Sequence, residues 1–231
     1  MRLCVIPARG GSKRIPRKNI RPFCGKPILA YPIAAARASG LFDRIVVSTE
    51  DTEIANTARE HGAEVPFLRP AELADDHTGT LPVIAQAIRW FIEQGETVSE
   101  VCALYATAAL IEPVHLRAAY DALRASDRDY VVCVVRYPHP IQRALRLDAD
   151  GTIAPLHPEY RVSRTQDLEP FYFDAGQFYW GRADAFLRAV PLHSSAALGF
   201  VLPAHAVQDI DTEEDWRRAE ALYRLGLSDG S

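Results

Sequence analysis

Short apolar runs alternate with longer segments of helical periodicity over the first 135 residues of the chain. The apolar runs are RLCVIP (2–7), RIVVS (44–48), VPFL (65–68), VCALYA (101–106) and YVVCVV (130–135), and the amphipathic segments between them are 27–39, 51–61, 80–94 and 115–126. Apolar strands that alternate with amphipathic helices are typical of a sheet covered by helices on both faces. The pattern therefore predicts a doubly wound, three-layer α/β fold with a mostly parallel sheet.

Proline residues break this rhythm between about residues 138 and 170. An ADG turn at 149–151 separates two short β-like runs there, which predicts an inserted hairpin arm, 138–170, outside the main sheet. The regular pattern then resumes, with strand-like runs at 176–181 and 200–203 and helices that begin near residues 182 and 211. Asp51 and Gly62 are the expected cap and stop of the helix at 51–61.

Composition limits the kind of protein and its partners. A chain of 231 residues with 48% hydrophobic composition can bury a sizeable core, and we expect a single domain, 1–231. The formal net charge of −4 gives no general attraction to nucleic acid or to an anionic membrane, so neither is an expected partner. Because no apolar stretch approaches the roughly 18 residues of a membrane span, and the first segment soon turns basic, we expect a cytoplasmic protein.

A basic, glycine-containing loop follows the first apolar run directly. The stretch VIPARGGSKRIPRKN (5–19) contains two glycines, five Lys or Arg residues and no acid. In a doubly wound sheet, ligands bind beyond the carboxyl ends of the strands. The N–H groups of Gly10 and Gly11, with the neighbouring cations, suit phosphate oxygens. Since GxxxxGK[ST] and GxGxxG are both absent, the stretch predicts either a different kind of phosphate site or a solvated basic loop.

Asp209 and Asp211 form a second candidate group, in VQDIDTEEDW (207–216). In an extended segment they point to the same side, and two such carboxylates can hold one Mg²⁺ that bridges to substrate phosphates. The alternative is structural, because Asp211 or Thr212 also suits the cap of a helix with an acidic first turn. Beside the basic loop, the pair favours metal-assisted chemistry at a nucleotide phosphate.

A third group of polar residues lies among aromatic ones in SRTQDLEPFYFDAGQFYWG (163–181). Apolar walls with a few fixed donors and acceptors suit a ligand the size of a sugar, although an ordinary strand with a packed aromatic face gives the same pattern. The candidate sugar-binding residues are Arg164, Gln166, Asp167, Asp174 and Gln177.

Four motifs together resemble the bacterial CMP-sugar synthetases, a family of cytidylyltransferases. IPARGGSKRIPRKNI, AELADDHTGT, RTQDLEPFYFDAGQFYWG and DIDTEEDW occur in the order and approximate spacing of that family, and the tract before AGQFYW is most like its pseudaminic acid branch. The resemblance implies a Rossmann-like nucleotidyltransferase fold. It also implies transfer of CMP from CTP to the anomeric hydroxyl of a nine-carbon 2-keto sugar acid, with release of pyrophosphate.

The resemblance further implies site residues and partners. Arg9, Lys13, Asp209 and Asp211 would be catalytic, with the two aspartates also binding Mg²⁺. The nucleotide-binding residues would be Ala8, Arg9, Gly10, Gly11, Ser12, Lys13, Lys18, Asn19, Thr78 and Thr80. The substrates would be CTP and a nonulosonic acid. The inserted stretch resembles the dimerisation arm of the family, which implies a homodimer.

Departures from the family patterns bear on the sugar. Kdo-type relatives lack the Lys18–Asn19 step, and sialic acid synthetases carry a Gln-Pro step where this chain reads ATAAL (106–110), so both are disfavoured. However, Ala109 replaces the proline and Phe173 the histidine that are usual in the pseudaminic type. Legionaminic and N-acetylneuraminic acid therefore stay open as substrates, as does a nucleotide-binding regulatory protein without catalysis.

Overall fold

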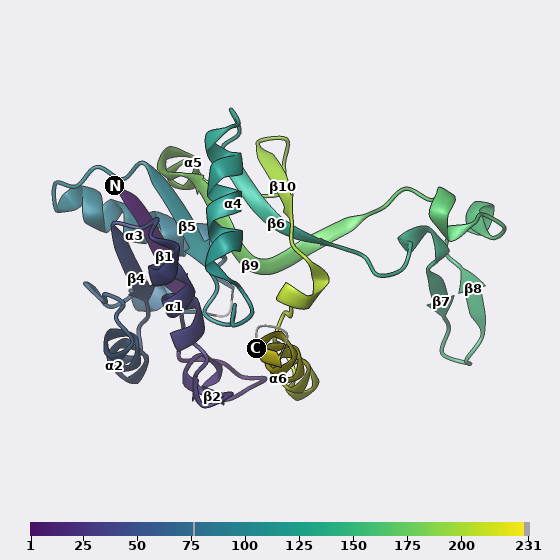
Figure 1. Ribbon diagram of the computed structural model, residues 1–231, viewed down its shortest axis with the longest axis horizontal. Helices are drawn as coiled ribbons and strands as arrows, with labels where there is room; N and C mark the ends of the chain where they lie inside the picture. The colour runs from purple at the N-terminus through teal and green to yellow at the C-terminus, as the bar shows by residue number, and fades with distance from the viewer. Residues whose placement is uncertain (76, 229–231) are drawn as a thin grey trace.

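The computed structural model describes residues 1–75 and 77–228 of the chain, and within these residues a six-stranded sheet forms the centre of the molecule (Figure 1). The strand order is β10-β6-β9-β5-β1-β4. The strands are β1 (Arg2–Pro7), β4 (Arg44–Ser48), β5 (Glu100–Leu104), β6 (Tyr130–Arg136), β9 (Tyr172–Arg182) and β10 (Ala197–Val201). Only β9 runs antiparallel to its neighbours among these six, which confirms the predicted mostly parallel sheet.

Helices cover both faces of this sheet. They are α1 (Ala30–Ser39), α2 (Thr52–Glu60), α3 (Thr80–Glu93), α4 (Pro113–Arg124), α5 (Ala183–Leu187) and α6 (Glu213–Ser228). On β1, Cys4 and Ile6 pack into a core with α1, α2 and α4, while Leu3 and Val5 pack into a second core with α3 and α5. Alternate side chains of one strand enter different cores, so the side chains on both faces of the strand must be apolar. This explains the continuous apolar runs.

The prediction of a strand at 65–68 is wrong. Only the residue before it, Glu64, forms an isolated parallel bridge to Val46 of β4. The next residue but one, Pro66, has no N–H to donate to a neighbouring strand, so the pairing cannot continue in a regular way. The chain instead turns over the end of the sheet, where the Arg69 amide donates to the Thr49 carbonyl at 2.8 Å.

Residues 137–171, between β6 and β9, leave the sheet and project from the body of the molecule (Figure 1). We call this segment the arm. It carries the antiparallel pair β7 (Leu145–Leu147) and β8 (Ile153–Pro155). Its exposed large apolar side chains include Leu145, Leu147, Ile153, Leu156 and Val162. Among the described residues, no helix is both long and apolar enough to cross a membrane.

A third, smaller core joins the two ends of the chain. Short strands β2 (Pro22–Phe23) and β3 (Lys26–Pro27) follow the basic stretch and lie against α6 (Figure 1). Phe23 makes an edge-to-face contact with Trp216 of α6 at a centroid distance of 5.6 Å, and Ile15 and Ile210 are buried in the same cluster. This packing fixes the basic loop beside the segment that holds Asp209 and Asp211.

Candidate functional site

A cleft of about 430 Å³ opens at the carboxyl edge of the parallel strands, next to the basic loop, which we define as residues 8–19. This is the edge at which doubly wound sheets bind ligands. The cleft is lined by Pro7, Arg9, Ser12, Lys13, Arg14, Lys18, Asn19, Arg69, Thr78, Gly79, Thr80, Val83, Tyr105, Ala106 and Thr107. The structure therefore brings together most of the residues expected at the nucleotide, from two segments that are distant in sequence, 9–19 and 78–80.

Ala8, Gly10 and Gly11 lie in the basic loop but do not line the cleft. Ala8 is buried, and its amide donates to the Ser48 carbonyl at 2.9 Å. The amide of Gly10 donates to Glu50 Oε1 at 2.6 Å, so it is already used inside the protein. A Cβ at Gly10 would lie 2.6 Å from Asp51 Oδ2, so glycine is required there for space.

Contacts with the start of α2 hold the basic loop in shape. Arg17, in the left-handed conformation with φ of 55°, pairs through both terminal nitrogens with Asp51, which also caps α2 as predicted. The hydrogen bond and charge of Arg17 lower the pKa of Asp51 to about 2. Asn19 Nδ2 donates to the Arg9 carbonyl at 2.9 Å, which joins the two ends of the loop. Arg17 thus faces α2, and its role is to fix the loop.

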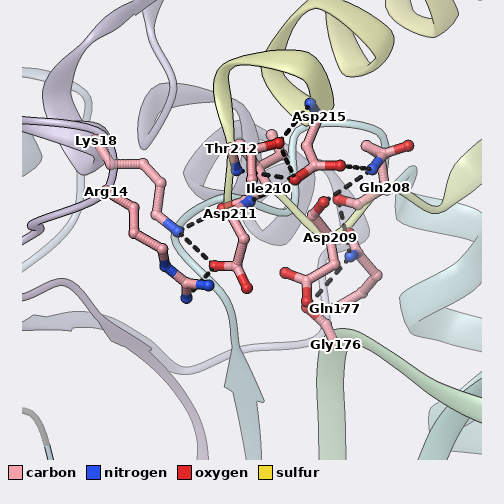
Figure 2. Close-up of polar contacts among 10 residues, drawn as sticks. All are labelled: Arg14, Lys18, Gly176, Gln177, Gln208, Asp209, Ile210, Asp211, Thr212 and Asp215. Atoms are coloured by element: carbon pink, nitrogen blue, oxygen red, sulfur yellow. Dashed lines mark hydrogen bonds and ion pairs between the residues drawn. The ribbon is translucent and has the colours of Figure 1, made fainter. Parts of the chain in front are cut away.

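Asp209 and Asp211, the carboxylate pair, lie between β10 and α6, and both carboxyl groups point to the same side of their segment (Figure 2). Arg14 Nη2 lies 2.7 Å and Lys18 Nζ 3.5 Å from Asp211 Oδ1. Lys18 Nζ also donates to the Ile210 carbonyl at 2.5 Å. Cations of the basic loop thus meet the carboxylate pair directly.

The α6 cap holds the carboxylate pair from the other side. Asp215 Oδ2 accepts from the Thr212 amide at 2.8 Å and from the Asp211 amide at 3.2 Å, while Thr212 Oγ1 accepts from the Asp215 amide (Figure 2). This reciprocal arrangement is a capping box of the Thr-x-x-Asp kind. The cap that the sequence offered as an alternative to metal binding is therefore supplied by Thr212 and Asp215, which leaves both carboxylates of the pair outside it.

The carboxylate pair fits a divalent cation. Burial, and next the charge of Asp211, raise the pKa of Asp209, so a cation placed between the two groups would relieve an unfavourable local charge. Among the described residues, no cluster of three or more His, Cys, Asp or Glu side chains could hold a metal ion. The protein would thus supply two oxygen ligands, and phosphate oxygens and water the remainder, which is common for Mg²⁺.

The candidate sugar-binding residues separate into two groups. Arg164, Gln166 and Asp167 are exposed on the arm, away from the sheet edge, and Arg164 Nε donates to Asp167 Oδ2 at 2.7 Å. Asp174 and Gln177 lie on β9, with their polar atoms engaged within the protein. Gln177 is 1% exposed, and its Nε2 donates to the Ala175 carbonyl at 2.9 Å.

Three polar side chains of the cleft outside the basic loop were not expected from the sequence: Arg69, Tyr105 and Thr107. Arg69 is buried, and its guanidinium donates to the carbonyl and hydroxyl oxygens of Ser48. Burial lowers the pKa of Arg69. A charged residue directly after the apolar run VPFL is a weak signal for such a site, and Tyr105 and Thr107 follow the apolar run of β5, where a parallel sheet places its ligands.

Comparisons with known proteins agree with this geometry. The profile of the family described as Cytidylyltransferase matches residues 3–170. The chain is 41% identical over 223 residues to pseudaminic acid cytidylyltransferase of Campylobacter jejuni subsp. jejuni serotype O:23/36, with 96% of each chain covered. It is 32% identical over 230 residues to CMP-N,N'-diacetyllegionaminic acid synthase of Legionella pneumophila, again with 96% of each covered.

A solved structure of CMP:2-keto-3-deoxy-manno-octonic acid synthetase complexed with CTP superposes with a TM-score of 0.71 at 16% identity, covering 97% of this chain and 99% of that one. The likeness extends to 4-diphosphocytidyl-2C-methyl-D-erythritol synthase from Anaerococcus prevotii, with a TM-score of 0.60 at 10% identity and coverage of 96% and 98%. At these identities the two superpositions bear on the fold, which is the α/β fold expected from the sequence.

Proposed function

Because the chain belongs to the cytidylyltransferase family, we propose that it transfers CMP from CTP to the anomeric hydroxyl of pseudaminic acid, a nine-carbon 2-keto sugar acid. The protein is a nucleotidyltransferase, and the proposal concerns its substrate and its site. The observation that carries the proposal is the meeting of Arg14 and Lys18 with Asp211 beside the cleft. Groups suited to phosphates and groups suited to a divalent cation thus lie together.

In the proposed reaction, a bond forms between the sugar oxygen and the α-phosphorus of CTP, and the bond from that phosphorus to the pyrophosphate oxygen breaks in line. Arg9 and Lys13 line the cleft and offset charge on the transferring and departing phosphates. A divalent cation, which we propose is Mg²⁺ held by Asp209 and Asp211, supplies further charge stabilisation when bound. The proton of the sugar hydroxyl would pass to a carboxylate of the pair, Asp209 or Asp211.

We propose that the sugar is bound with the help of a second protomer. The arm places Arg164, Gln166 and Asp167 far from the cleft of their own protomer, so in a homodimer the arm of one copy would bring them to the site of the other. A guanidinium recognises a carboxylate through two parallel hydrogen bonds, which suits Arg164 for the acid group of the sugar. Asp174 and Gln177 would shape this subsite from within the protein. We propose a cytoplasmic location, because CTP is a cytoplasmic metabolite.

Pyrophosphate release tests the proposed function. The purified protein is mixed with CTP, Mg²⁺ and one of four acids, namely pseudaminic, legionaminic, N-acetylneuraminic or Kdo, with a control that lacks sugar. We expect turnover with pseudaminic acid and a background rate without sugar. Turnover with legionaminic or N-acetylneuraminic acid alone would keep the reaction and overturn the assignment of the sugar. Binding of CTP without turnover of any acid would favour a regulatory nucleotide-binding protein instead.

A further inference from the structure

A row of hydroxyl groups runs from the cleft into the sheet. Thr80, the first residue of α3, and Tyr105, the residue after β5, both line the cleft. Thr80 Oγ1 lies 3.2 Å from the Tyr105 hydroxyl, which lies 3.3 Å from the hydroxyl of Tyr179 on β9. The Tyr179 hydroxyl in turn donates to Asp174 Oδ2 at 2.6 Å. Four side chains from α3, the β5 exit and β9 therefore form one continuous hydrogen-bonded row, which we call the hydroxyl row.

The carboxylate at the end of the hydroxyl row fixes the direction of every hydrogen bond in it. An ionised carboxylate only accepts, and each hydroxyl has one proton to give. Since Tyr179 gives its proton to Asp174, it can only accept from Tyr105, and Tyr105 can then only accept from Thr80. Burial and the neighbouring hydroxyl of Tyr105 raise the pKa of Tyr179, so this phenol keeps its proton throughout the physiological range.

Asp174 is held firmly as the end of the hydroxyl row. Its Oδ1 accepts from the Gly176 amide at 2.8 Å, and His193 Nε2 lies 2.8 Å from its Oδ2. The rings of Tyr105 and Tyr179 meet edge to face at a centroid distance of 5.7 Å, and Tyr179 is only 4% exposed. The Tyr179 ring and the Asp174 carboxylate are thus held in place, and the carboxylate directs the hydroxyl protons along the row.

We propose that Asp174, Tyr179 and Tyr105 are positioning residues that commit the proton of Thr80 to the protein, so that Thr80 Oγ1 presents only lone pairs to the cleft. This part of the wall then selects a nucleotide with a hydrogen-bond donor at that point, which is either the exocyclic amine of cytosine or a ribose hydroxyl. A nucleotide with an acceptor or a hydrogen there leaves the threonine oxygen unpaired, which costs binding free energy. The inference rests on the proposed binding of CTP in this cleft.

Binding constants of nucleotides, measured by calorimetry without sugar, test the inference. UTP replaces the base amine by a carbonyl, and 2′-deoxy-CTP and 3′-deoxy-CTP each lack one ribose hydroxyl. We expect the wild type to prefer CTP over at least one of these analogues. In Tyr105→Phe and Tyr179→Phe, which interrupt the hydroxyl row but keep the rings, that preference should fall about 10-fold, because Thr80 is freed to donate. Which analogue responds identifies the donor.

Tyr120→Phe is the matched control, because the Tyr120 hydroxyl contacts Glu100 in the core on the other side of the sheet. It should leave the preference for CTP unchanged. Tyr105 is partly exposed, so its variant provides the test even if Tyr179→Phe does not fold. Equal weakening of CTP and all analogues in the Phe variants, or no change, would overturn the inference. Failure of the wild type to bind CTP would instead overturn the proposed function on which the inference rests.

Discussion

At the scale of single residues, the two carboxylates of the pair differ in their surroundings. Arg14 and Lys18 both approach one oxygen of Asp211 and offset its charge, whereas burial beside Asp211 raises the pKa of Asp209. The pair is thus neither fully neutralised by the basic loop nor free of repulsion. Such an arrangement accommodates an added cation better than either two exposed acids or two complete ion pairs would.

Asp211→Asn should reduce CMP transfer by about 100-fold or more, because charge stabilisation by a metal at phosphates is worth several kcal/mol. The rate of pyrophosphate release at saturating substrates measures the effect. Glu213→Gln is the matched control, since Glu213 is an acid two positions away that pairs with Arg21 on the surface. A loss of similar size in both variants would contradict a specific role for Asp211.

The raised pKa of Asp209 also predicts how cation affinity depends on pH. A cation that binds Asp209 must displace the proton of its carboxyl group where that group is protonated. Because the pKa of Asp209 is raised, this competition begins at a higher pH than for an ordinary aspartate. Below that raised pKa, the half-saturating cation concentration should increase about tenfold for each unit by which the pH falls, because one proton is displaced per cation bound. Activation curves recorded at several pH values measure this, and in Asp209→Asn the steep dependence should be absent.

At the scale of elements, Asp51 joins the basic loop to α2. It accepts from the amides of Glu53 and Ile54 at 2.9 and 3.0 Å, and it pairs with Arg17. Since the pKa of Asp51 falls from 3.8 to about 2, its contribution to stability is complete above pH 3.8 and is lost as the pH falls through about 2. The shift corresponds to about 2 kcal/mol.

Asp51→Ala should therefore lower the free energy of unfolding at pH 7 by about 2 kcal/mol, and Asp51→Asn by less, because asparagine still caps a helix. Urea unfolding at several pH values measures both. The difference between the wild type and Asp51→Asn should shrink as the pH falls toward 2. A difference that is constant with pH would mean that the ion pair with Arg17 contributes nothing.

Gly181 lies on β9 against two aromatic rings. A Cβ there would lie 2.4 Å from Tyr130 Cδ1 and 2.8 Å from Phe186 Cε2. Gly181→Ala should lower the free energy of unfolding by about 1–3 kcal/mol, as overpacking of a core does. Gly199→Ala on β10 is the control, because its nearest neighbour, Val134 Cγ2, lies at an ordinary 3.6 Å. Thermal unfolding compares the two, and equal stabilities would show that the rings move aside freely.

What the sequence predicted at this scale depended on local information. Continuous apolar runs and a capping aspartate are readable in a short window, so the strands and the start of α2 follow from the pattern. The segment at 65–68 has the apolar pattern of a strand, but Pro66 lacks the N–H that continued pairing with β4 after Glu64 would require. The pairing of Ala103 on β5 with Tyr179 on β9, which brings the two tyrosines of the hydroxyl row together, has no local signal at all.

At the scale of the whole molecule, the candidate sugar-binding residues show the same limit. They lie close together in sequence, between Arg164 and Gln177, yet the chain passes from the arm into β9 within that interval. Sequence proximity therefore predicted one group where the structure has two. By contrast, the basic loop and the carboxylate pair are remote in sequence. The sequence predicted that they share one site only because a phosphate-binding loop and a metal-binding pair are chemically complementary.

The arm carries the prediction for assembly. Leu147 and Ile153 are 71% and 62% exposed on it, and a second copy of the chain would cover such side chains. Leu147→Lys and Ile153→Lys should each convert a dimer to a monomer at micromolar concentration, as measured by sedimentation velocity. Val114→Lys, at a half-exposed position on α4, should leave the dimer intact. A wild type that sediments as a monomer would contradict the proposed dimer.

The ion pair between Arg14 and Asp211 joins residues 197 positions apart. At a synthesis rate of 5–20 residues per second, roughly 10 to 40 s pass on the ribosome between the two. During that interval a nascent chain has the basic loop but not its acidic counterpart, and a prematurely terminated chain remains in that state. Such chains lack the carboxylates that we propose hold the metal, and on that proposal catalytic competence arises only after translation has passed residue 211.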